Sequence, residues 1–564
     1  MARRLPPRYV LNLGLIALTA ALFGACADDA KEGPDDGGAG AAGSPDSGGS
    51  AGVSGSAGSG GSAGVSGSAG AGGSGASGSS SAGEGGGGTN QGGAPVAGGE
   101  GGDGGGADRA GAGGDGGQGG SADELPRSTP QQLTNESAAD YADNQHGLIT
   151  GSTLKPWVEN WAANRPAAVT GKLVILQIGS SAATSLTHVS GEGENVVSYL
   201  VPSSELVQVR DNGLSSIEAE LPNGAAADAF LKKYGIDVSK DFVVLTFEQL
   251  PASGQTPATA NAIVQSVGRA WLLLSYWGYP KERLGILNGS VNWNADHEEL
   301  PLSTTAATTP PNDGTSSVRD LRVDNTTWVV TLSELLGILK DESDDYPRED
   351  VSVIDARGGA EALGLLKSTS TGKTDCPSYT GTAPNSRCSP PFEGRLKGAH
   401  SVPWPELLTG AQDGFRFPAK ATVKATFDAL SEYEPGNVTI QYCRTNMRSM
   451  VTGIVSSIIL GYPTRFYDTS FIEWSHLAHG PTPKTQVLPQ NSPFRTDLAE
   501  LTEHASVTGY TPGGAFDSTT VVVTGWASGP NYNADADISN TPIQVVPTAT
   551  STNRSVEEDR AYKL

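Results

Sequence analysis

Short runs of aliphatic and β-branched residues alternate with longer stretches of helical apolar spacing between residues 150 and 485. The runs are "KLVILQIG" (172–179), "DFVVLTF" (241–247), "VSVIDARG" (351–358) and "GNVTIQYC" (436–443). Runs that are apolar on both faces are typical of parallel strands with helices on each side of the sheet. The pattern therefore predicts an α/β fold with parallel sheets flanked by helices.

The same arrangement occurs twice along the chain. The segment "LLLSYWGYPKERLGILNGSVNWN" (272–294) matches "VSSIILGYPTRFYDTSFIEWS" (455–475), "LVPSSEL" (200–206) matches "SVPWPEL" (401–407), and the four strand-like runs match in pairs. Chance similarity between two α/β domains is a poor explanation for four blocks in one order, so the repeats predict two domains of one kind. We place these tandem domains at 150–300 and 328–485, with a linker at 301–327.

The remaining extension, residues 486–564, is partly strand-like. "STTVVVTGWA" (518–527) and "TPIQVVPTAT" (541–550) have the composition of strands. The last residues, "NRSVEEDRAYKL" (553–564), are charged, and we expect this end to be frayed.

Composition separates the first part of the chain from the rest. Residues 26–125 are nearly all Gly, Ala and Ser, with scattered acidic residues. Such a segment buries too little apolar surface to offset the entropy of ordering it, which predicts a long disordered spacer. The net charge of −24 argues against a nucleic-acid-binding protein, and an anionic substrate would need local cations.

Residues 1–25 have the basic start and apolar stretch of an export signal, too short for a comfortable membrane span. This segment ends in "LFGAC", which resembles the lipobox of bacterial lipoproteins, with Phe23 where that family usually has Leu. The resemblance implies a lipid on Cys26 and a membrane anchor in the bacterial cell envelope. Ala27, rather than Asp, follows Cys26 and favours the outer membrane. The alternative is an ordinary secretory signal with an incidental cysteine.

The chain has four cysteines. In an oxidising compartment we expect Cys376 and Cys388 to form a disulfide, which leaves Cys443. A zinc site is not expected, because no second close cysteine pair or histidine pair accompanies these residues. We expect no metal and no cofactor.

Cys443 follows the strand-like "NVTIQY" and precedes a predicted helix, "MRSMVTGIVSSIIL" (447–460). The carboxyl ends of parallel strands are where such folds bind ligands, and a short loop there can turn its amides inward as an anion nest. Together with Arg444 and Arg448, these groups should favour the nucleophilic thiolate.

A thiolate in this setting can take up sulfane sulfur, attack phosphorus or act as a redox sensor. Four residues separate Cys443 from Arg448, whereas tyrosine phosphatases need five at the corresponding place to enclose a phosphate. The smaller ring suits a single sulfur atom. The alternative without chemistry is a buried structural cysteine at the end of a strand.

Four segments resemble the tandem rhodanese-like sulfurtransferases. They are "VIDAR" (353–357), "GRLKGAHSVPW" (394–404), "CRTNMRS" (443–449) and "LGYPTRFYDTSFIEW" (460–474). The resemblance implies a catalytically silent first domain, where Phe247 stands in place of Cys443, and a catalytic second domain. It also implies sulfur transfer from a small anionic donor, thiosulfate or 3-mercaptopyruvate, to cyanide or a thiol through a persulfide on Cys443.

The resemblance further implies roles for individual residues. The substrate-binding set is the loop Arg444, Thr445, Asn446, Met447, Arg448 and Ser449, whose amides would stabilise the persulfide while the arginines orient the donor. Arg448 could instead point into its own helix or pair with Asp355. Asp355 and Arg357 are expected to brace the site.

Three further positions of the second domain carry expectations. Asn446 replaces the family's Gly, and Asn tolerates the left-handed backbone better than other non-glycine residues. We expect His400 to begin a strand rather than act as a base, and Trp404 to pack rather than line a pocket mouth.

Two further functions stay open at the level of sequence. One is a non-catalytic binding module that uses the same fold, and the other is a surface redox sensor. The enzymatic interpretation requires an accessible sulfur, so a Cys443 closed off from solvent would favour the binding module. The sequence predicts no particular oligomeric state.

Overall fold

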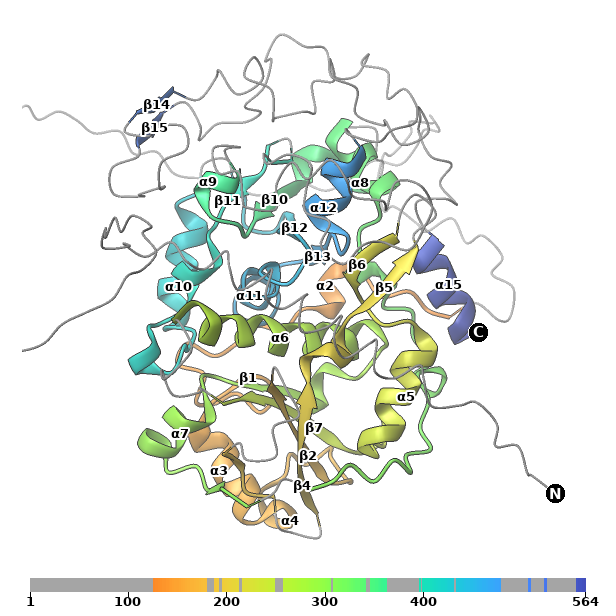
Figure 1. Ribbon diagram of the computed structural model, residues 1–564, viewed down its shortest axis with the longest axis vertical. Helices are drawn as coiled ribbons and strands as arrows, with labels where there is room; N and C mark the ends of the chain where they lie inside the picture. The colour runs from red at the N-terminus through yellow and green to blue at the C-terminus, as the bar shows by residue number, and fades with distance from the viewer. Residues whose placement is uncertain are drawn as a thin grey trace, which may run out of the picture. The chain divides into compact units, whose positions relative to one another are not determined.

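The computed structural model describes residues 125–179, 187–191, 195–211, 216–248, 257–305, 308–340, 345–362, 395–396, 398–430, 433–477, 506–508, 522–524 and 554–564. Two parallel sheets flanked by helices account for most of the strand residues in these ranges (Figure 1). The predicted α/β class is therefore confirmed. The leader, Cys26 and nearly all of the expected spacer lie outside the described residues.

The first sheet comes from the first half of the folded region. Its order is β1 (Gly147–Ile149), β8 (Leu284–Leu287), β7 (Phe242–Phe247), β2 (Leu173–Gly179) and β4 (Val196–Pro202), with every pairing parallel. Every residue of β2 and β7 is buried, as the continuous apolar runs predict.

Successive side chains of β2 point to opposite faces of this sheet, and each face has its own helices. Leu173 and Ile175 pack in the cluster of α3 (Gly151–Glu159), α4 (Trp161–Asn164) and α7 (Val291–Glu298). Val174 and Leu176 pack in the cluster that contains α5 (Gly224–Tyr234) and α6 (Pro257–Tyr276).

The second sheet is shorter and equally parallel. Its order is β11 (His400–Ser401), β10 (Val351–Asp355), β12 (Val438–Tyr442) and β13 (Thr464–Phe466). Val353 packs with α8 (Leu332–Lys340) and α12 (Ser470–Leu477), whereas Ile354 packs with α10 (Lys420–Asp428) and α11 (Ser449–Ile454). A short helix, α9 (Gly359–Ala362), follows β10.

The two sheets have equivalent strand orders. A parallel bridge from Val329 to Phe466 adds a fifth position beside β13, so the order Val329, β13, β12, β10, β11 corresponds to β1, β8, β7, β2, β4. The matched sequence blocks occupy equivalent places, with β2 opposite β10, β7 opposite β12 and β8 opposite β13. The blocks "LVPSSEL" and "SVPWPEL" each leave a strand and continue as a 3-10 turn (Ser203–Leu206 and Trp404–Leu407).

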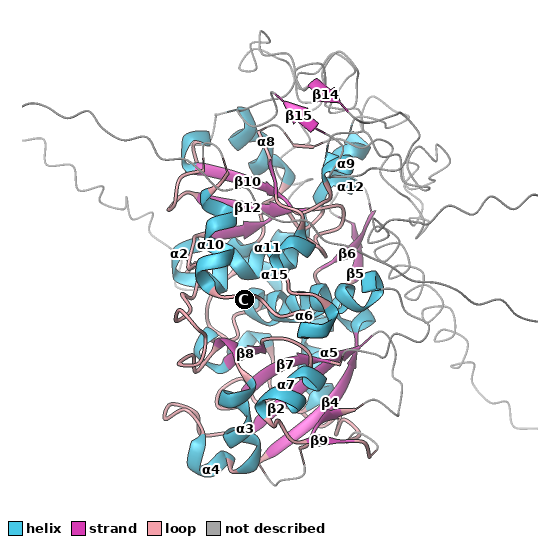
Figure 2. Ribbon diagram, turned by 90° about the vertical axis from the view of Figure 1, so that its left-hand side faces the viewer, coloured by secondary structure: helices cyan, strands magenta, loops and turns pink. Residues whose placement is uncertain are grey.

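Helices α6 and α11 lie between the two sheets (Figure 2). Both contribute to one apolar cluster, and a Cβ placed on Gly268 of α6 would lie only 2.5 Å from the Cβ of Met450. The expected helix at 447–460 is present, but its last turn, Val455–Ile459, is a π-helix. The Ser457 hydroxyl donates to the Gly453 carbonyl at 2.6 Å there, a side-chain bond that competes with the regular helical ladder.

The end of the chain differs from the expectation. Residues Arg554–Lys563 form helix α15, and the expectation of a frayed end was wrong. Asp559 is 1% exposed and pairs with Arg210 at 2.8 Å, while the Lys563 ammonium donates to the carbonyl of Trp277 at 2.9 Å. An ion pair and a hydrogen bond to residues far away in the chain, together with the buried Val556 and the packing of Tyr562 against Trp277, therefore order this mostly polar helix.

The remaining strands are short. β3 (His188–Val189) pairs with β9 (Leu302–Ser303), and β5 (Gln208–Asp211) pairs with β6 (Ser216–Glu220), both antiparallel. In the extension, β15 (Val522–Thr524) falls in the expected strand at 518–527 and pairs with β14 (Ser506–Thr508), whereas 541–550 is not described. A four-residue helix, α2 (Pro130–Leu133), precedes the first sheet. None of the helices in the described ranges is long and apolar enough to cross a membrane.

Two glycines in helices predict alanine substitutions that change stability in opposite directions. A Cβ on Gly453 in α11 would lie 2.2 Å from the Phe466 ring, whereas a Cβ on Gly337 in α8 meets no atom within 4 Å. We expect Gly453→Ala to lower the free energy of unfolding by about 1–3 kcal/mol through overpacking. Gly337→Ala should raise it by about 0.4–1 kcal/mol because the unfolded chain loses freedom. Chemical denaturation of the two variants checks both signs, and equal effects would contradict the packing described here.

Candidate functional site

Cys443 lies at the carboxyl edge of the second sheet, directly after β12. β12 is flanked by β10 and β13, so the cysteine follows an interior strand. The loop 444–448 connects it to α11, and the first turn of α12 lies against it. This is the place in an open parallel sheet where loops collect functional groups.

Asn446 gives the loop its bend. Its φ angle of 56° is left-handed, in agreement with the expectation that Asn can replace Gly here. The side chain is fully buried and held on both sides, since its amide donates to Asp468 Oδ1 at 2.8 Å and its carbonyl accepts from the Ser449 hydroxyl at 2.6 Å. A buried, doubly bonded Asn shapes this loop and leaves its side-chain amide committed to Asp468.

The carbonyl groups at the start of the loop face α12. The Phe471 amide donates to the carbonyl of Cys443 at 3.1 Å, and the Ile472 amide donates to that of Arg444 at 3.0 Å. In a trans peptide the N–H points opposite to the C=O, so the amides of residues 444 and 445 point away from α12. Amides turned to one side beside a left-handed residue are the elements of an anion nest.

Glu361 binds both loop arginines, a contact that the sequence analysis missed. Arg444 Nη2 lies 2.8 Å and Arg448 Nη2 lies 3.1 Å from Glu361 Oε1, and Arg448 Nη1 also bonds Oε2. The carboxylate is 3% exposed. Burial alone would raise the pKa of Glu361, but the charges of Arg448 and Arg444 lower it to about 2. The group is therefore ionised, and the three side chains together carry one net positive charge.

A sequence signal for Glu361 existed. It lies on the short helix α9 that leaves the carboxyl end of β10, and β10 is the neighbour of β12. The carboxyl ends of neighbouring parallel strands meet at one edge, so an acidic residue soon after β10 can reach cations that follow β12.

Asp355 and Arg357 form a second buried pair, and the charge of Arg357 also lowers the pKa of Glu361. Arg357 Nη2 lies 2.7 Å from Asp355 Oδ2, and the Tyr442 hydroxyl donates to the same oxygen at 2.7 Å. The Arg357 guanidinium also lies 4.0 Å from the centre of the Phe471 ring. Neither of the alternatives considered for Arg448 is observed, because Asp355 pairs with Arg357 while Arg448 pairs with Glu361.

The sulfur of Cys443 is closed off from solvent. Cys443 is 1% exposed and Met447 is 3% exposed, and Cys443 belongs to the apolar cluster that runs between the sheets. The enzymatic interpretation requires an accessible sulfur, and this conformation does not provide one. A donor can reach Cys443 only if the surrounding residues move.

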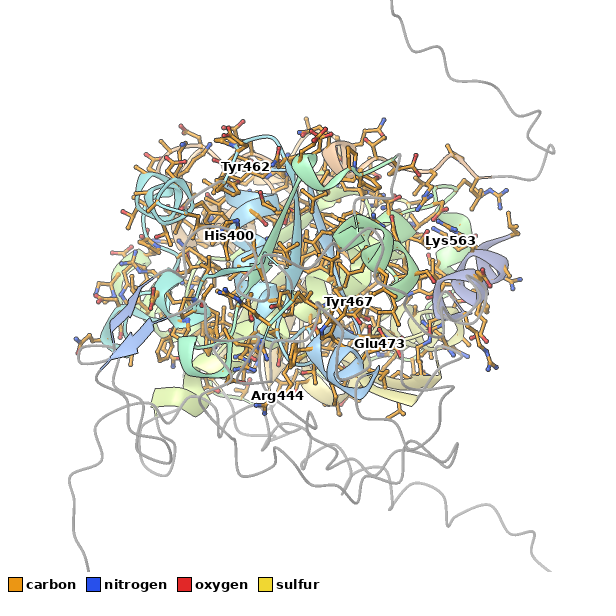
Figure 3. The ribbon with its side chains drawn as sticks, turned by 90° about the horizontal axis from the view of Figure 1, so that it is seen from above. His400, Arg444, Tyr462, Tyr467, Glu473 and Lys563 are labelled. Carbon is orange, nitrogen blue, oxygen red and sulfur yellow. The ribbon has the colours of Figure 1, made fainter. Side chains whose placement is uncertain are left out.

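The other expected site residues have structural places. His400 begins β11, and Trp404 is 4% exposed and packs in the core, as expected for both. His400 and Arg444 are well separated in the view of Figure 3. Among the described residues no group of three or more His, Cys, Asp or Glu side chains could hold a metal ion. The expected disulfide between Cys376 and Cys388 lies outside the described residues.

Comparisons with known proteins give distant structural matches only. No protein-family model matches the sequence, and no curated protein matches it. The Tum1 protein from Saccharomyces cerevisiae is similar over 60% of this chain and 97% of its own, at 16% identity and a TM-score of 0.40.

Two other solved structures give similar values. The anaerobic ergothioneine biosynthesis enzyme from Chlorobium limicola is similar over 59% of this chain and 69% of its own, at 16% identity and a TM-score of 0.42. The protein YnjE is similar over 58% of this chain and 66% of its own, at 14% identity and a TM-score of 0.39. At these values the likeness carries no activity over to this chain.

Proposed function

We propose that the chain is a sulfurtransferase that carries sulfane sulfur as a persulfide on Cys443. The supporting observation is the loop that begins after Cys443 at the carboxyl edge of the second sheet and bends at the left-handed Asn446. Its first amides turn away from α12, and the short Cys-to-Arg spacing suits one sulfur atom. The motifs "VIDAR" and "CRTNMRS" resemble the rhodanese-like sulfurtransferases at these positions.

The reaction has two halves. With thiosulfate, the Cys443 thiolate attacks the sulfane sulfur, the S–S bond of the donor breaks, and sulfite leaves with the electron pair. With 3-mercaptopyruvate, the C–S bond breaks and pyruvate leaves after protonation of its enolate. Cyanide or a thiol then attacks the outer sulfur of the persulfide, and the Cys443 thiolate leaves.

The charges around the loop suit an anionic donor even though Glu361 is present. Among the described residues, Arg444 and Arg448 share the carboxylate of Glu361, and these three side chains carry one net positive charge, to which the amides of residues 444–449 add partial positive charge in this proposal. The arginines keep donors in reach while Glu361 holds their guanidinium groups in place. Entry of the donor requires the loop or its cover to move, because Cys443 is buried.

The tandem-domain arrangement and the cell-envelope location belong to the same proposal. The equivalent strand orders of the two sheets support two related domains, with Phe247 at the end of β7 where Cys443 follows β12. The leader and "LFGAC" support an anchor on Cys26. Lipid labelling that disappears in Cys26→Ala would test the anchor.

A non-catalytic binding module is the second candidate. The observation that favours it is the 1% exposure of Cys443 together with the pairing of both loop arginines to Glu361. In that function the cysteine is part of the core.

Mass spectrometry after treatment with a sulfur donor separates the two candidates. We expect the peptide that contains Cys443 to gain the mass of one sulfur atom after thiosulfate or 3-mercaptopyruvate, and to lose it after cyanide. The Cys443→Ala variant should show neither the adduct nor thiocyanate formation. If no donor gives an adduct on the folded chain, while denatured protein is alkylated normally at Cys443, the binding module is the better account.

A further inference from the structure

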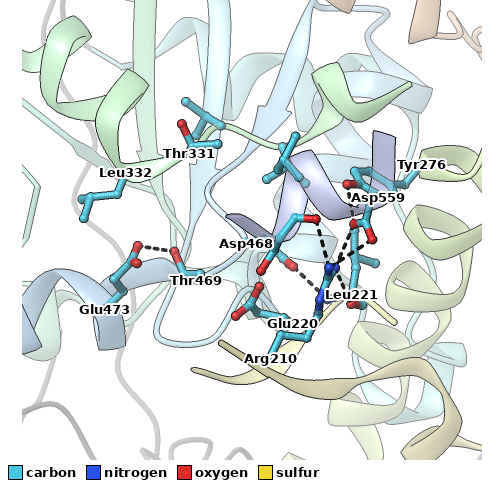
Figure 4. A pocket seen from close by; sticks show the side chains of 14 residues that line it. Arg210, Glu220, Leu221, Tyr276, Thr331, Leu332, Asp468, Thr469, Glu473 and Asp559 are labelled. Atoms are coloured by element: carbon cyan, nitrogen blue, oxygen red, sulfur yellow. Dashed lines mark hydrogen bonds and ion pairs between the residues drawn. The ribbon is translucent and has the colours of Figure 1, made fainter. Parts of the chain in front are cut away.

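A pocket that Cys443 does not line lies beside the turn between β13 and α12 (Figure 4). It is lined by residues of β5, β6 and α6 from the first half of the chain, and by the segment 329–332, the β13–α12 turn and α12 from the second. Helix α15 completes it with Ser555, Val556 and Asp559. About 410 Å³ of space free of protein atoms lies in the pocket, part of it open to solvent.

The lining is rich in carboxyl groups. Glu220, Asp468, Glu473 and Asp559 all contribute, against one cationic lining residue, Arg210. Arg210 is already committed, because its guanidinium binds both oxygens of Asp559 at 2.8 and 3.0 Å. The lining therefore has no further cationic residue to pair with the other three carboxyl groups.

Asp468 and Glu473, two of these three carboxyl groups, each have partners. Asp468 binds the buried guanidinium of Arg269. Glu473 accepts the Tyr467 hydroxyl at 2.6 Å and also bonds the Thr469 hydroxyl.

Glu220 differs from the other three. It is 3% exposed, and its Oε1 atom has no hydrogen-bond partner. Figure 4 shows its carboxyl group beside Asp468 within the pocket. Burial and the nearby charge of Asp468 raise the pKa of Glu220 well above its usual value, although the charge of Arg210 opposes them. A buried carboxyl oxygen without a partner is unfavourable, and a donor that carries positive charge would relieve both defects.

We propose that this pocket binds the protonated primary amine of a small organic cation, with Glu220 as the main acceptor. An ammonium group supplies three N–H donors and a positive charge. Its head is about the size of a water molecule, so the pocket has room for it. The inference does not rest on the function proposed for Cys443.

The simplest alternative is that Glu220 is satisfied without a ligand. The Ser555 hydroxyl also lines the pocket and lies close enough to Glu220 to lower the pKa of that carboxyl, although it makes no hydrogen bond of good geometry; a small rotation would complete this bond. Water could do the same. Either arrangement supplies a hydrogen bond but no charge, and neither predicts any preference for ammonium over a neutral molecule of the same shape.

Calorimetric titration and thermal unfolding of the full chain with butylammonium chloride test the proposal. The matched ligands are 1-butanol, which has the same chain without the charge, and sodium chloride, which has a charge without N–H donors. We expect butylammonium alone to bind and to raise the unfolding temperature in proportion to saturation. Equal effects of butylammonium and sodium chloride, or of butylammonium and butanol, would overturn the site.

The variant Glu220→Gln keeps the shape of the side chain and removes its charge. We expect it to bind butylammonium at least tenfold more weakly than the wild type, with a cooperative unfolding transition retained. Undiminished binding by this variant contradicts the role of Glu220. If the variant does not fold, the comparison of the three ligands on the wild-type chain still decides the question.

Discussion

Replacement of Asp468 by alanine should lower the free energy of unfolding by about 3–5 kcal/mol, the usual effect of removing one partner from a buried ion pair. Asp468 binds the guanidinium of Arg269, which is fully buried, and accepts from the Leu221 amide at 2.8 Å. It also accepts from Asn446 at 2.8 Å. Alanine would leave a charge and two donors buried without their acceptor.

Chemical denaturation of the full chain measures this change, with Asp428→Ala as the matched control. Asp428 also pairs with a cation, Lys424, but that pair is exposed on α10, so its loss should change stability little. An equally small change for both variants would contradict a clamp between the two halves of the chain.

The Asp468 clamp also reaches the loop of Cys443. Arg269 belongs to α6 in the first half of the chain, and Asn446 belongs to the loop, so Asp468 links the two directly. We expect Asp468→Ala to change the rate at which an alkylating reagent modifies Cys443 in the folded protein. The first half would then help to position the loop even though it has no cysteine of its own at Phe247.

Removal of the Glu361 charge should change how stability depends on pH. The pKa of Glu361 is about 2 in the folded protein, against an ordinary value of 4.5. A lowered folded pKa means that the carboxylate contributes its stabilisation above pH 4.5 and loses it as the pH falls towards 2. The difference amounts to about 3 kcal/mol, and it comes from the charges of Arg448 and Arg444, which outweigh the effect of burial.

The measurement compares the wild type with Glu361→Gln across this range of pH. At neutral pH the variant should be less stable, because both arginines remain buried without their carboxylate. The gap should shrink by about 3 kcal/mol between pH 4.5 and pH 2, where the wild-type carboxyl becomes neutral as well. A gap that stays constant across this range would show that Glu361 does not hold the two cations as described.

The local features of this protein can be predicted from its sequence. Continuous apolar runs predicted the buried strands β2 and β7, because a strand that is covered on both faces has no polar side. The position of Cys443 after β12 and the left-handed Asn446 were also predictable, since each depends on residues close together in the chain.

Which charges meet and which groups are closed off from solvent depends on how distant parts of the chain pack together. Arg269 and Asp468 are 199 positions apart, and Arg210 and Asp559 are 349 apart, so no local pattern connects them. The charged sequence of α15 predicts a frayed end because its partners, such as Arg210, lie far away in the chain. The burial of Cys443 likewise depends on core residues from distant segments, which the sequence does not show. Burial and ion pairing depend on long-range contacts, and those contacts set both the charge of the loop and access to its sulfur.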